Sequence, residues 1–170
     1  QGGVRRGASI GILNVNHPDI FEFISCKSDL TKFQNFNISV AITDNFLKAV
    51  VQGNPFPLRN PHTQEKTYIN AGQLFDALCL QAWTTGEPGV IFLDTINSKN
   101  PTPWLGKMEG SNPCGEVPML PYESCNLGSI DISKLVVNKK IDWDRLAEIV
   151  AIAVRFLDDV IDVSKFPTVQ

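Results

Sequence analysis

Three short apolar runs, separated by stretches with helical periodicity, restrict the fold of this chain more than any other feature of its sequence. Residues 9–15 are apolar and compatible with a strand, 36–42 alternate apolar with small or polar side chains, and 90–94 form an apolar run after a turn. The third pattern is typical of a buried parallel strand. Strands of this kind that alternate with helices predict an α/β layer or an α/β barrel.

Capping residues indicate where the helices begin. Asn70, followed three residues later by Gln73, forms a capping-box pattern that predicts a helix to about Thr84. Asp142 precedes a longer run in which apolar residues recur on one helical face. Further helix starts are expected near residues 16–19 and 43–45.

Three prolines in residues 53–61 predict a loop. A proline cannot donate a backbone hydrogen bond to a strand ladder, so this segment is expected to connect elements within one domain. The sequence contains no repeat, no low-complexity run and no clear domain boundary. We therefore interpret residues 1–170 as part of a single domain.

The four cysteines are spread along the chain and do not form a metal-binding pattern. They stand at positions 26, 79, 114 and 125, without a Cys-x-x-Cys pair or paired histidines, so we expect no metal site. Cys79 follows Leu78 on a predicted helix and is expected to be a core residue. A disulfide between Cys114 and Cys125 is possible in principle, but in a reduced protein an exchange-competent pair is more often catalytic than architectural.

Residues 111–116 bring three reactive or hydrogen-bonding groups into one short segment. Pro113 and Gly115 rule out a regular helix or a central strand there, which predicts a shaped loop. Asn112, Cys114 and Glu116 supply an amide, a thiol and a carboxylate. A thiol can give up a hydrogen atom or act as a nucleophile, a carboxylate can take a proton, and an amide can donate and accept hydrogen bonds. This loop is the candidate catalytic segment.

The same residues carry a family resemblance. Asn-x-Cys-x-Glu at 112–116, followed by Tyr-Glu-Ser-Cys-Asn-Leu at 122–127, resembles the catalytic region of ribonucleotide reductase large chains, most closely the class II, adenosylcobalamin-dependent enzymes. Further stretches resemble family landmarks in the family's order: 1–8, 17–20, 35–40 and 88–92.

The resemblance implies a fold and a place within a longer protein. The family's large chain is several times longer, so we expect this sequence to be an internal fragment. It would supply about half of a ten-stranded α/β barrel with the Cys114 loop projecting through its centre. A half barrel leaves sheet edges unpaired, so the isolated piece is expected to be unstable or prone to aggregation. Strand character is expected to resume at 125–130.

The resemblance also implies roles for the loop residues in the reduction of ribonucleotides to deoxyribonucleotides. Cys114, as a transient thiyl radical, would abstract the ribose 3′ hydrogen, and Glu116 would take the 3′-hydroxyl proton so that the 2′-hydroxyl leaves as water. Asn112 would orient the hydroxyls. Cys125 would be one of two thiols that are oxidised to a disulfide, with its partner upstream of this sequence.

The first residues of the chain resemble the loop that connects the specificity effector to the substrate base. Glycines allow close approach of the backbone to a ligand, and arginines match phosphate groups or base edges. The residues with this implied role are Gln1, Gly2, Gly3, Arg5 and Arg6.

The implied partners are those of a reductase. They are a ribonucleoside di- or triphosphate substrate, a deoxynucleotide or ATP effector, a thioredoxin-like or dithiol reductant, and a second copy in a homodimer of the full-length chain. The net charge of −3 gives no electrostatic case for a nucleic-acid or membrane partner. No apolar run approaches the roughly 20 residues that span a bilayer, and no export signal is visible. We therefore expect a cytoplasmic protein.

Two alternatives remain open at this point. The nearer one is a class I large chain with the same catalytic residues, whose radical comes from a separate metal-bearing subunit. The distant one is a non-catalytic scaffold or thiol-redox module in which Cys114 and Cys125 exchange disulfides. A redox module needs a thiol of depressed pKa, whereas a hydrogen-atom donor needs a protonated thiol.

Overall fold

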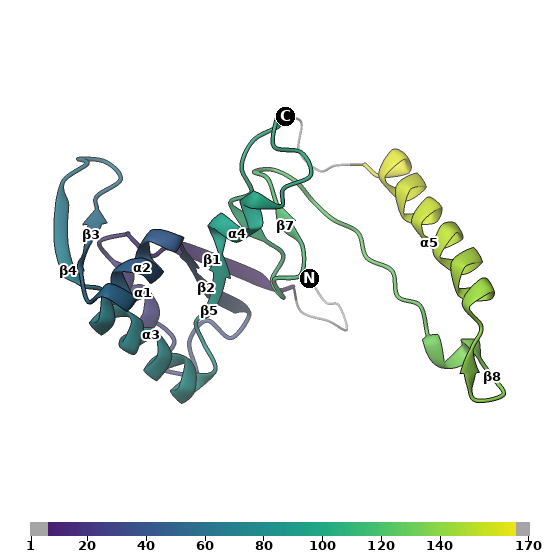
Figure 1. Cartoon of the computed structure of the whole chain (residues 1–170), viewed down its shortest axis with the longest axis horizontal. Helices are drawn as coiled ribbons and strands as arrows, with labels where there is room; N and C mark the ends of the chain where they lie inside the picture. The colour runs from purple at the N-terminus through teal and green to yellow at the C-terminus, as the bar shows by residue number, and fades with distance from the viewer. Residues whose placement is uncertain (1–6, 166–170) are drawn as a thin grey trace. The chain divides into compact units, whose positions relative to one another are not determined.

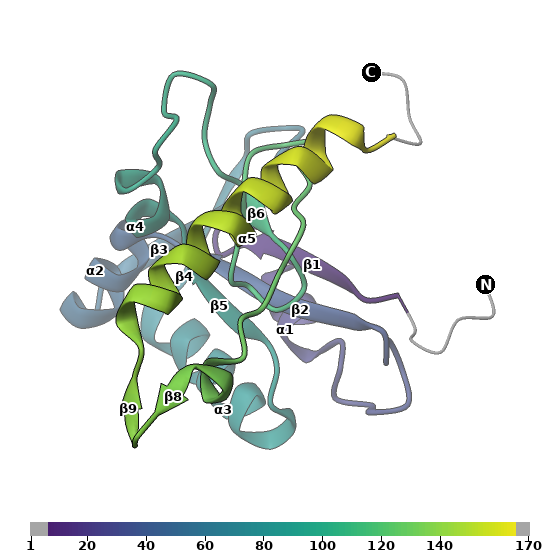
Figure 2. The ribbon, with the colours of Figure 1, turned by 90° about the vertical axis from the view of Figure 1, so that its right-hand side faces the viewer.

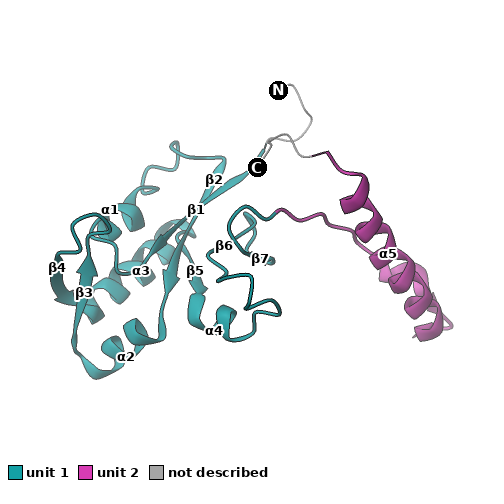
Figure 3. Cartoon of the chain, turned by 90° about the horizontal axis from the view of Figure 1, so that it is seen from above, with its two compact units in different colours: residues 1–123 teal, residues 124–170 magenta. Residues whose placement is uncertain are grey.

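The computed structural model describes residues 7–165, and the chain divides into two compact units (Figure 3). The first unit spans Gln1–Glu123 and the second spans Ser124–Gln170. Helices and strands alternate along the first unit and its main sheet is parallel, which confirms the α/β class. Among the described residues the strands form small sheets and no closed barrel.

A three-stranded parallel sheet forms the centre of the first unit. Its strands are β1 (Ser9–Asn14), β2 (Phe36–Ile42) and β5 (Gly89–Phe92), in the order β1-β2-β5 (Figure 2). All three strands lie at the apolar runs of the sequence. The central strand β2 is buried continuously from Ile38 to Ile42.

Three helices gather beside this sheet (Figure 1). They are α1 (Ile20–Ser25), α2 (Asp44–Gln52) and α3 (Ala71–Thr85). The caps of α2 and α3 are confirmed, because Thr43 accepts from Phe46 N and Asn70 accepts from Gln73 N, whereas Asp19 before α1 makes no side-chain cap bond. The core between the helices and the sheet is apolar, and its fully buried members include Val15, Ile20, Val40, Phe46 and Leu74.

The prediction of a loop at 53–61 was wrong, because β3 (Pro55–Arg59) pairs antiparallel with β4 (Lys66–Asn70). In an antiparallel pair only alternate residues bond the partner strand. Arg59 N donates away from β4, to Asn16 O at 2.7 Å. Positions 55 and 57 point the same way as 59, so both prolines stand where β4 needs no donor.

Two burial predictions were also wrong. In β5 only Ile91 is buried, whereas Val90 and Phe92 are 45% and 47% exposed, because β5 is an edge strand among the described residues. Cys79 is exposed rather than in the core. It follows the buried Leu78 by one residue, which turns its side chain about 100° around α3 and away from the core.

The second unit contains a hairpin and the longest helix. Asp142 caps this helix as predicted, since its carboxylate accepts from Arg145 N at 3.0 Å. Residues 125–130 contain no strand, which corrects the prediction for that segment, because no neighbouring strand pairs with it among the described residues. No helix in the described part of the chain is long and apolar enough to cross a bilayer. The elements are η1 (Ile132–Leu135), β8 (Val136–Val137), β9 (Lys140–Ile141) and α5 (Trp143–Val163).

Candidate active site

The candidate catalytic residues stand at the tip of a short hairpin in the first unit. Its strands are β6 (Gly110–Ser111) and β7 (Pro118–Met119), which pair antiparallel. The register joins Ser111 to Pro118, so residues 112–117 form the connecting loop. The sequence predicted the loop from its proline and glycine but gave no sign of strands this short.

Bonds within the loop fix its shape. Gly115 N donates to Asn112 O at 2.9 Å, and Val117 N donates to Asn112 Oδ1 at 3.0 Å. Gly115 has a φ of +83°, in the left-handed region that favours glycine. The amide oxygen of Asn112 therefore orders the loop, a structural task that the sequence prediction did not include.

The hairpin is tied to the body of the unit by asparagine side chains. Asn97 of α4 (Leu93–Ser98) donates to Met108 O at 3.0 Å and accepts from Met108 N at 2.9 Å. Asn37 Nδ2 donates to Pro113 O at 2.7 Å. Sequence reasoning missed both residues, because a single asparagine carries no signal for a contact with a distant segment.

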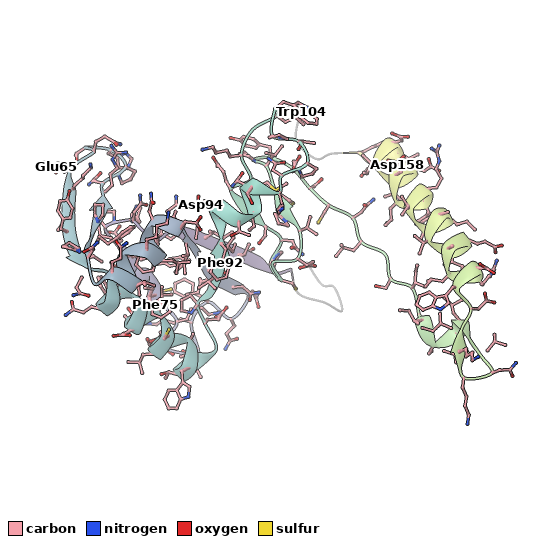
Figure 4. All side chains as sticks on the ribbon, viewed as in Figure 1. Glu65, Phe75, Phe92, Asp94, Trp104 and Asp158 are labelled. Carbon is pink, nitrogen blue, oxygen red and sulfur yellow. The ribbon has the colours of Figure 1, made fainter. Side chains whose placement is uncertain are left out.

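The helix that carries Asn97 is itself fixed to the unit. Asp94 is the second residue of α4 and follows Phe92, the last residue of β5, by two positions (Figure 4). Its Oδ2 accepts from Asp44 N at 2.8 Å, which joins α4 to the first turn of α2. The base of the hairpin is thus connected through α4 to the helical layer.

An open pocket of about 410 Å3 lies between this loop and the sheet. The sheet supplies Ile10, Ser39 and Ile91 to its lining, and the loop supplies Cys114. Ile10, Ser39 and Ile91 lie on one face of the sheet. Ile10 pairs with Asn37, two residues before Ser39, and Ser39 pairs with Gly89, two residues before Ile91. Residues two apart on a strand share a face. The thiol therefore borders a mainly apolar space large enough for part of a small-molecule ligand.

The predicted site residues fall into three groups. Asn112, Cys114 and Glu116 share the loop, where the Cys114 and Glu116 side chains are exposed. Cys125 belongs to the second unit, where it is an exposed free thiol; its neighbour Asn126 donates to Leu157 O at 2.9 Å. The predicted effector-loop residues lie outside the described residues: Gln1, Gly2, Gly3, Arg5 and Arg6.

Metal-binding geometry is not found in the part of the chain that the structure describes. No group of three or more His, Cys, Asp or Glu side chains there could hold an ion. Two acidic residues near the end of α5 lie close to a cation, since Arg155 is 3.0 Å from Asp159 and 4.0 Å from Asp158.

Burial raises the pKa of the Cys26 thiol, and the nearby Glu87 carboxylate adds to the shift, while Lys27 opposes it. We therefore expect the rate of Cys26 alkylation to reach half its maximum at a pH above the ordinary thiol pKa of about 8.5. The neutral thiol stabilises the fold below the unfolded pKa, and this contribution is lost as the pH rises through the folded pKa. Mass spectrometry of the full-length protein, alkylated across pH 7–10, measures the pKa of Cys26. Cys26→Ser is the control for site assignment. A midpoint at or below 8.5 would contradict the raised pKa.

The family follows from comparison with known proteins. A family model described as the barrel domain of ribonucleotide reductase matches residues 1–170. A vitamin B12-dependent ribonucleoside-diphosphate reductase from Thermoplasma acidophilum is 57% identical over 173 residues, and one from Mycobacterium tuberculosis is 51% identical over 169. A vitamin B12-dependent ribonucleotide reductase from Streptomyces clavuligerus is 34% identical over 196 residues.

These alignments cover 98% to 100% of this chain but only 20% to 24% of the relatives' own length. The chain belongs to the ribonucleotide reductase family and matches its barrel domain. This confirms the family resemblance on which the site prediction rests.

Proposed function

We propose that this chain is the part of a class II ribonucleotide reductase that carries its radical-forming cysteine. The observation that carries the proposal is the exposed Cys114 on an ordered loop above an open pocket, with Glu116 two residues away. The names of the similar proteins support reduction of a ribonucleoside diphosphate and dependence on vitamin B12. They favour the class II reading over a class I chain.

The chemistry proposed for this loop needs one thiol that gives and takes a hydrogen atom. As a thiyl radical, Cys114 takes the 3′ hydrogen of the ribose, which leaves an unpaired electron on the 3′ carbon and restores the S–H bond. Glu116 accepts the 3′-hydroxyl proton, and the 2′ C–O bond breaks as the 2′-hydroxyl takes a proton from a thiol of the Cys125 pair and leaves as water. After reduction of the 2′ carbon, Cys114 returns the hydrogen atom to the 3′ carbon.

Asn112 is proposed to orient the ribose hydroxyls during this reaction. Its amide oxygen already accepts from Val117 N, so the Nδ2 donors are the groups that we assign to a substrate hydroxyl. We infer that Asn112 donates to a ribose hydroxyl while its oxygen keeps the loop in shape.

The names of the similar proteins support adenosylcobalamin as the cofactor that acts on this loop. When bound, it supplies the one-electron chemistry that removes the hydrogen atom from the Cys114 sulfur. The Cys114 thiol is exposed, so its sulfur is accessible to a bound cofactor. Cys114 is the residue of this chain that we assign to face it.

Cys125 is proposed as one of two thiols that supply two electrons and become a disulfide. We expect Cys125→Ser in the full-length protein to form almost no deoxynucleotide, because the two electrons for each reduction come from a disulfide that can no longer form. Rapid-quench counting of deoxynucleotide per enzyme measures this, with Cys79→Ser as a matched exposed-cysteine control that turns over normally. Sustained turnover by Cys125→Ser would remove Cys125 from the mechanism.

The remaining parts of the proposal concern the whole protein. Residues 1–170 would belong to one α/β barrel domain of ten strands, and the full-length chain would form a homodimer. An effector nucleotide would act through the residues at the start of the chain, and a dithiol or thioredoxin-like protein would reduce the disulfide. These follow from the family and not from a contact among the described residues.

The test of the function is ribonucleotide reduction by the full-length protein with a dithiol, with and without adenosylcobalamin. We expect deoxynucleotide only when the cobalamin is present. Activity that instead requires a separate metal-bearing subunit would move the protein to class I. Folded protein that is inactive under both conditions would overturn the proposal.

A further inference from the structure

The central strand β2 extends beyond its neighbour β5 at its amino-terminal end. β5 begins at Gly89, which lies opposite Ser39, so residues 36–38 have no strand partner on that side within the described part of the chain. Backbone groups of a sheet that lack partners cost free energy when they are shielded from water. In this sheet, side chains supply the bonds.

Lys27 and Glu87 take the place of the missing strand. Lys27 Nζ donates to Phe36 O at 2.6 Å, and Ile38 N donates to Glu87 Oε1 at 3.3 Å. The two side chains also form an ion pair with each other and are 11% and 24% exposed. Because they bond the backbone before and after Asn37, they restrict the position of this one residue.

Asn37 in turn reaches the catalytic loop. Its Nδ2 donates to Pro113 O at 2.7 Å, a bond between residues 76 positions apart. The Pro113 carbonyl belongs to the same peptide group as Cys114 N, so its orientation sets the direction in which the Cys114 side chain leaves the backbone. The Asn37 side chain also lies on the pocket face of the sheet, since Asn37 and Ser39 are two residues apart on β2.

We propose that Asn37 is a positioning residue for Cys114, held in place by the Lys27–Glu87 pair. This inference rests on the proposed function in one respect, because the position of the thiol affects turnover only if Cys114 is the reacting group. The bond itself aligns the sulfur with the pocket, without contact between Asn37 and the reacting atoms.

The variant Asn37→Asp isolates this bond. Asp has the same shape as Asn but, when ionised, offers only acceptor oxygens to the Pro113 carbonyl. We expect kcat of the full-length enzyme to fall about 10²-fold, the order lost when a reacting group is misplaced by roughly 1 Å. The KM for the ribonucleotide should stay within about 2-fold, because no substrate contact is removed.

The pH profile separates positioning from a general structural effect. A protonated Asp can donate as Asn does, so the activity of Asn37→Asp relative to the wild type should rise several-fold from pH 8 to pH 5, toward the ordinary carboxyl pKa of about 3.9. Asn37→Ala has no donor at any pH and should show a flat ratio. Asn54→Asp is the matched control, since the one side-chain bond of Asn54 among the described residues goes to its near neighbour Gln52, and this variant should behave as wild type.

A second readout keeps the result separate from the proposed function. The rate at which iodoacetamide alkylates Cys114 in the full-length protein should change in Asn37→Asp, whereas the rate at Cys79 should not. If the wild type reduces no ribonucleotide, the function fails and this rate still tests the positioning. A kcat within 2-fold of wild type, a rise in KM alone, or an unchanged Cys114 rate would each overturn the inference.

Discussion

Replacing Cys114 with serine should abolish ribonucleotide reduction by the full-length protein while leaving its fold intact. An O–H bond is much stronger than an S–H bond, so the serine hydroxyl cannot give up and recover a hydrogen atom as the thiol does. We expect kcat to fall by about 10³-fold or more, the order seen when an essential reactive group is removed. The measurement is deoxynucleotide formation with adenosylcobalamin and a dithiol.

Because Cys114 is exposed, its replacement with serine should affect the reaction without affecting the fold. Its side chain is exposed on the loop, and the bonds that shape the loop come from Gly115, Asn112 and Val117 and not from the sulfur. The melting temperature of Cys114→Ser should therefore match the wild type. Cys79→Ser is the control for loss of an exposed thiol and should remain active. Residual turnover of Cys114→Ser above about one tenth of wild type would show that the radical forms elsewhere.

Replacing Lys27 with methionine should cost about 3 kcal/mol of local stability. The substitution leaves the Glu87 carboxylate mostly buried without its cation and removes the donor to Phe36 O. We take the lower end of the usual range because Glu87 retains 24% of its side-chain exposure. Hydrogen exchange of the Ile38 amide in the full-length protein measures the free energy of opening at this point.

The double variant Lys27→Met, Glu87→Gln provides the control. Glutamine keeps an acceptor for Ile38 N but removes the unpaired charge, so part of the lost stability should return. Because the same backbone holds Asn37, the single variant should also reduce kcat. Protection at Ile38 within about 0.5 kcal/mol of wild type in Lys27→Met would show that the ion pair does not hold this backbone.

The features that could be predicted from the sequence are those set by local chemistry. Thr43, Asn70 and Asp142 cap their helices because a side-chain oxygen and a backbone donor two or three residues later suffice for the bond. The shaped loop at 112–117 followed from Pro113 and Gly115 in the same way. Neither prediction depends on distant parts of the chain.

The features that were missed depend on direction or on distant partners. The prolines of β3 suggested a loop because their number is visible in the sequence, whereas the side to which each missing donor points is not. Cys79 was placed in the core from its apolar neighbours, although its angular position on α3 decides its exposure. The bond from Asn37 to Pro113 spans 76 residues and is invisible to any local pattern.

The two asparagines that tie the hairpin to the unit also suggest how the site ages. Asparagine is among the thermolabile residues, because its side-chain amide slowly hydrolyses to a carboxylate. At Asn37 or Asn97 this change would replace the Nδ2 donor with an oxygen that repels the carbonyl it now holds. A stored molecule would then remain folded while its loop loses alignment, so the shelf life of the activity is expected to be shorter than that of the fold.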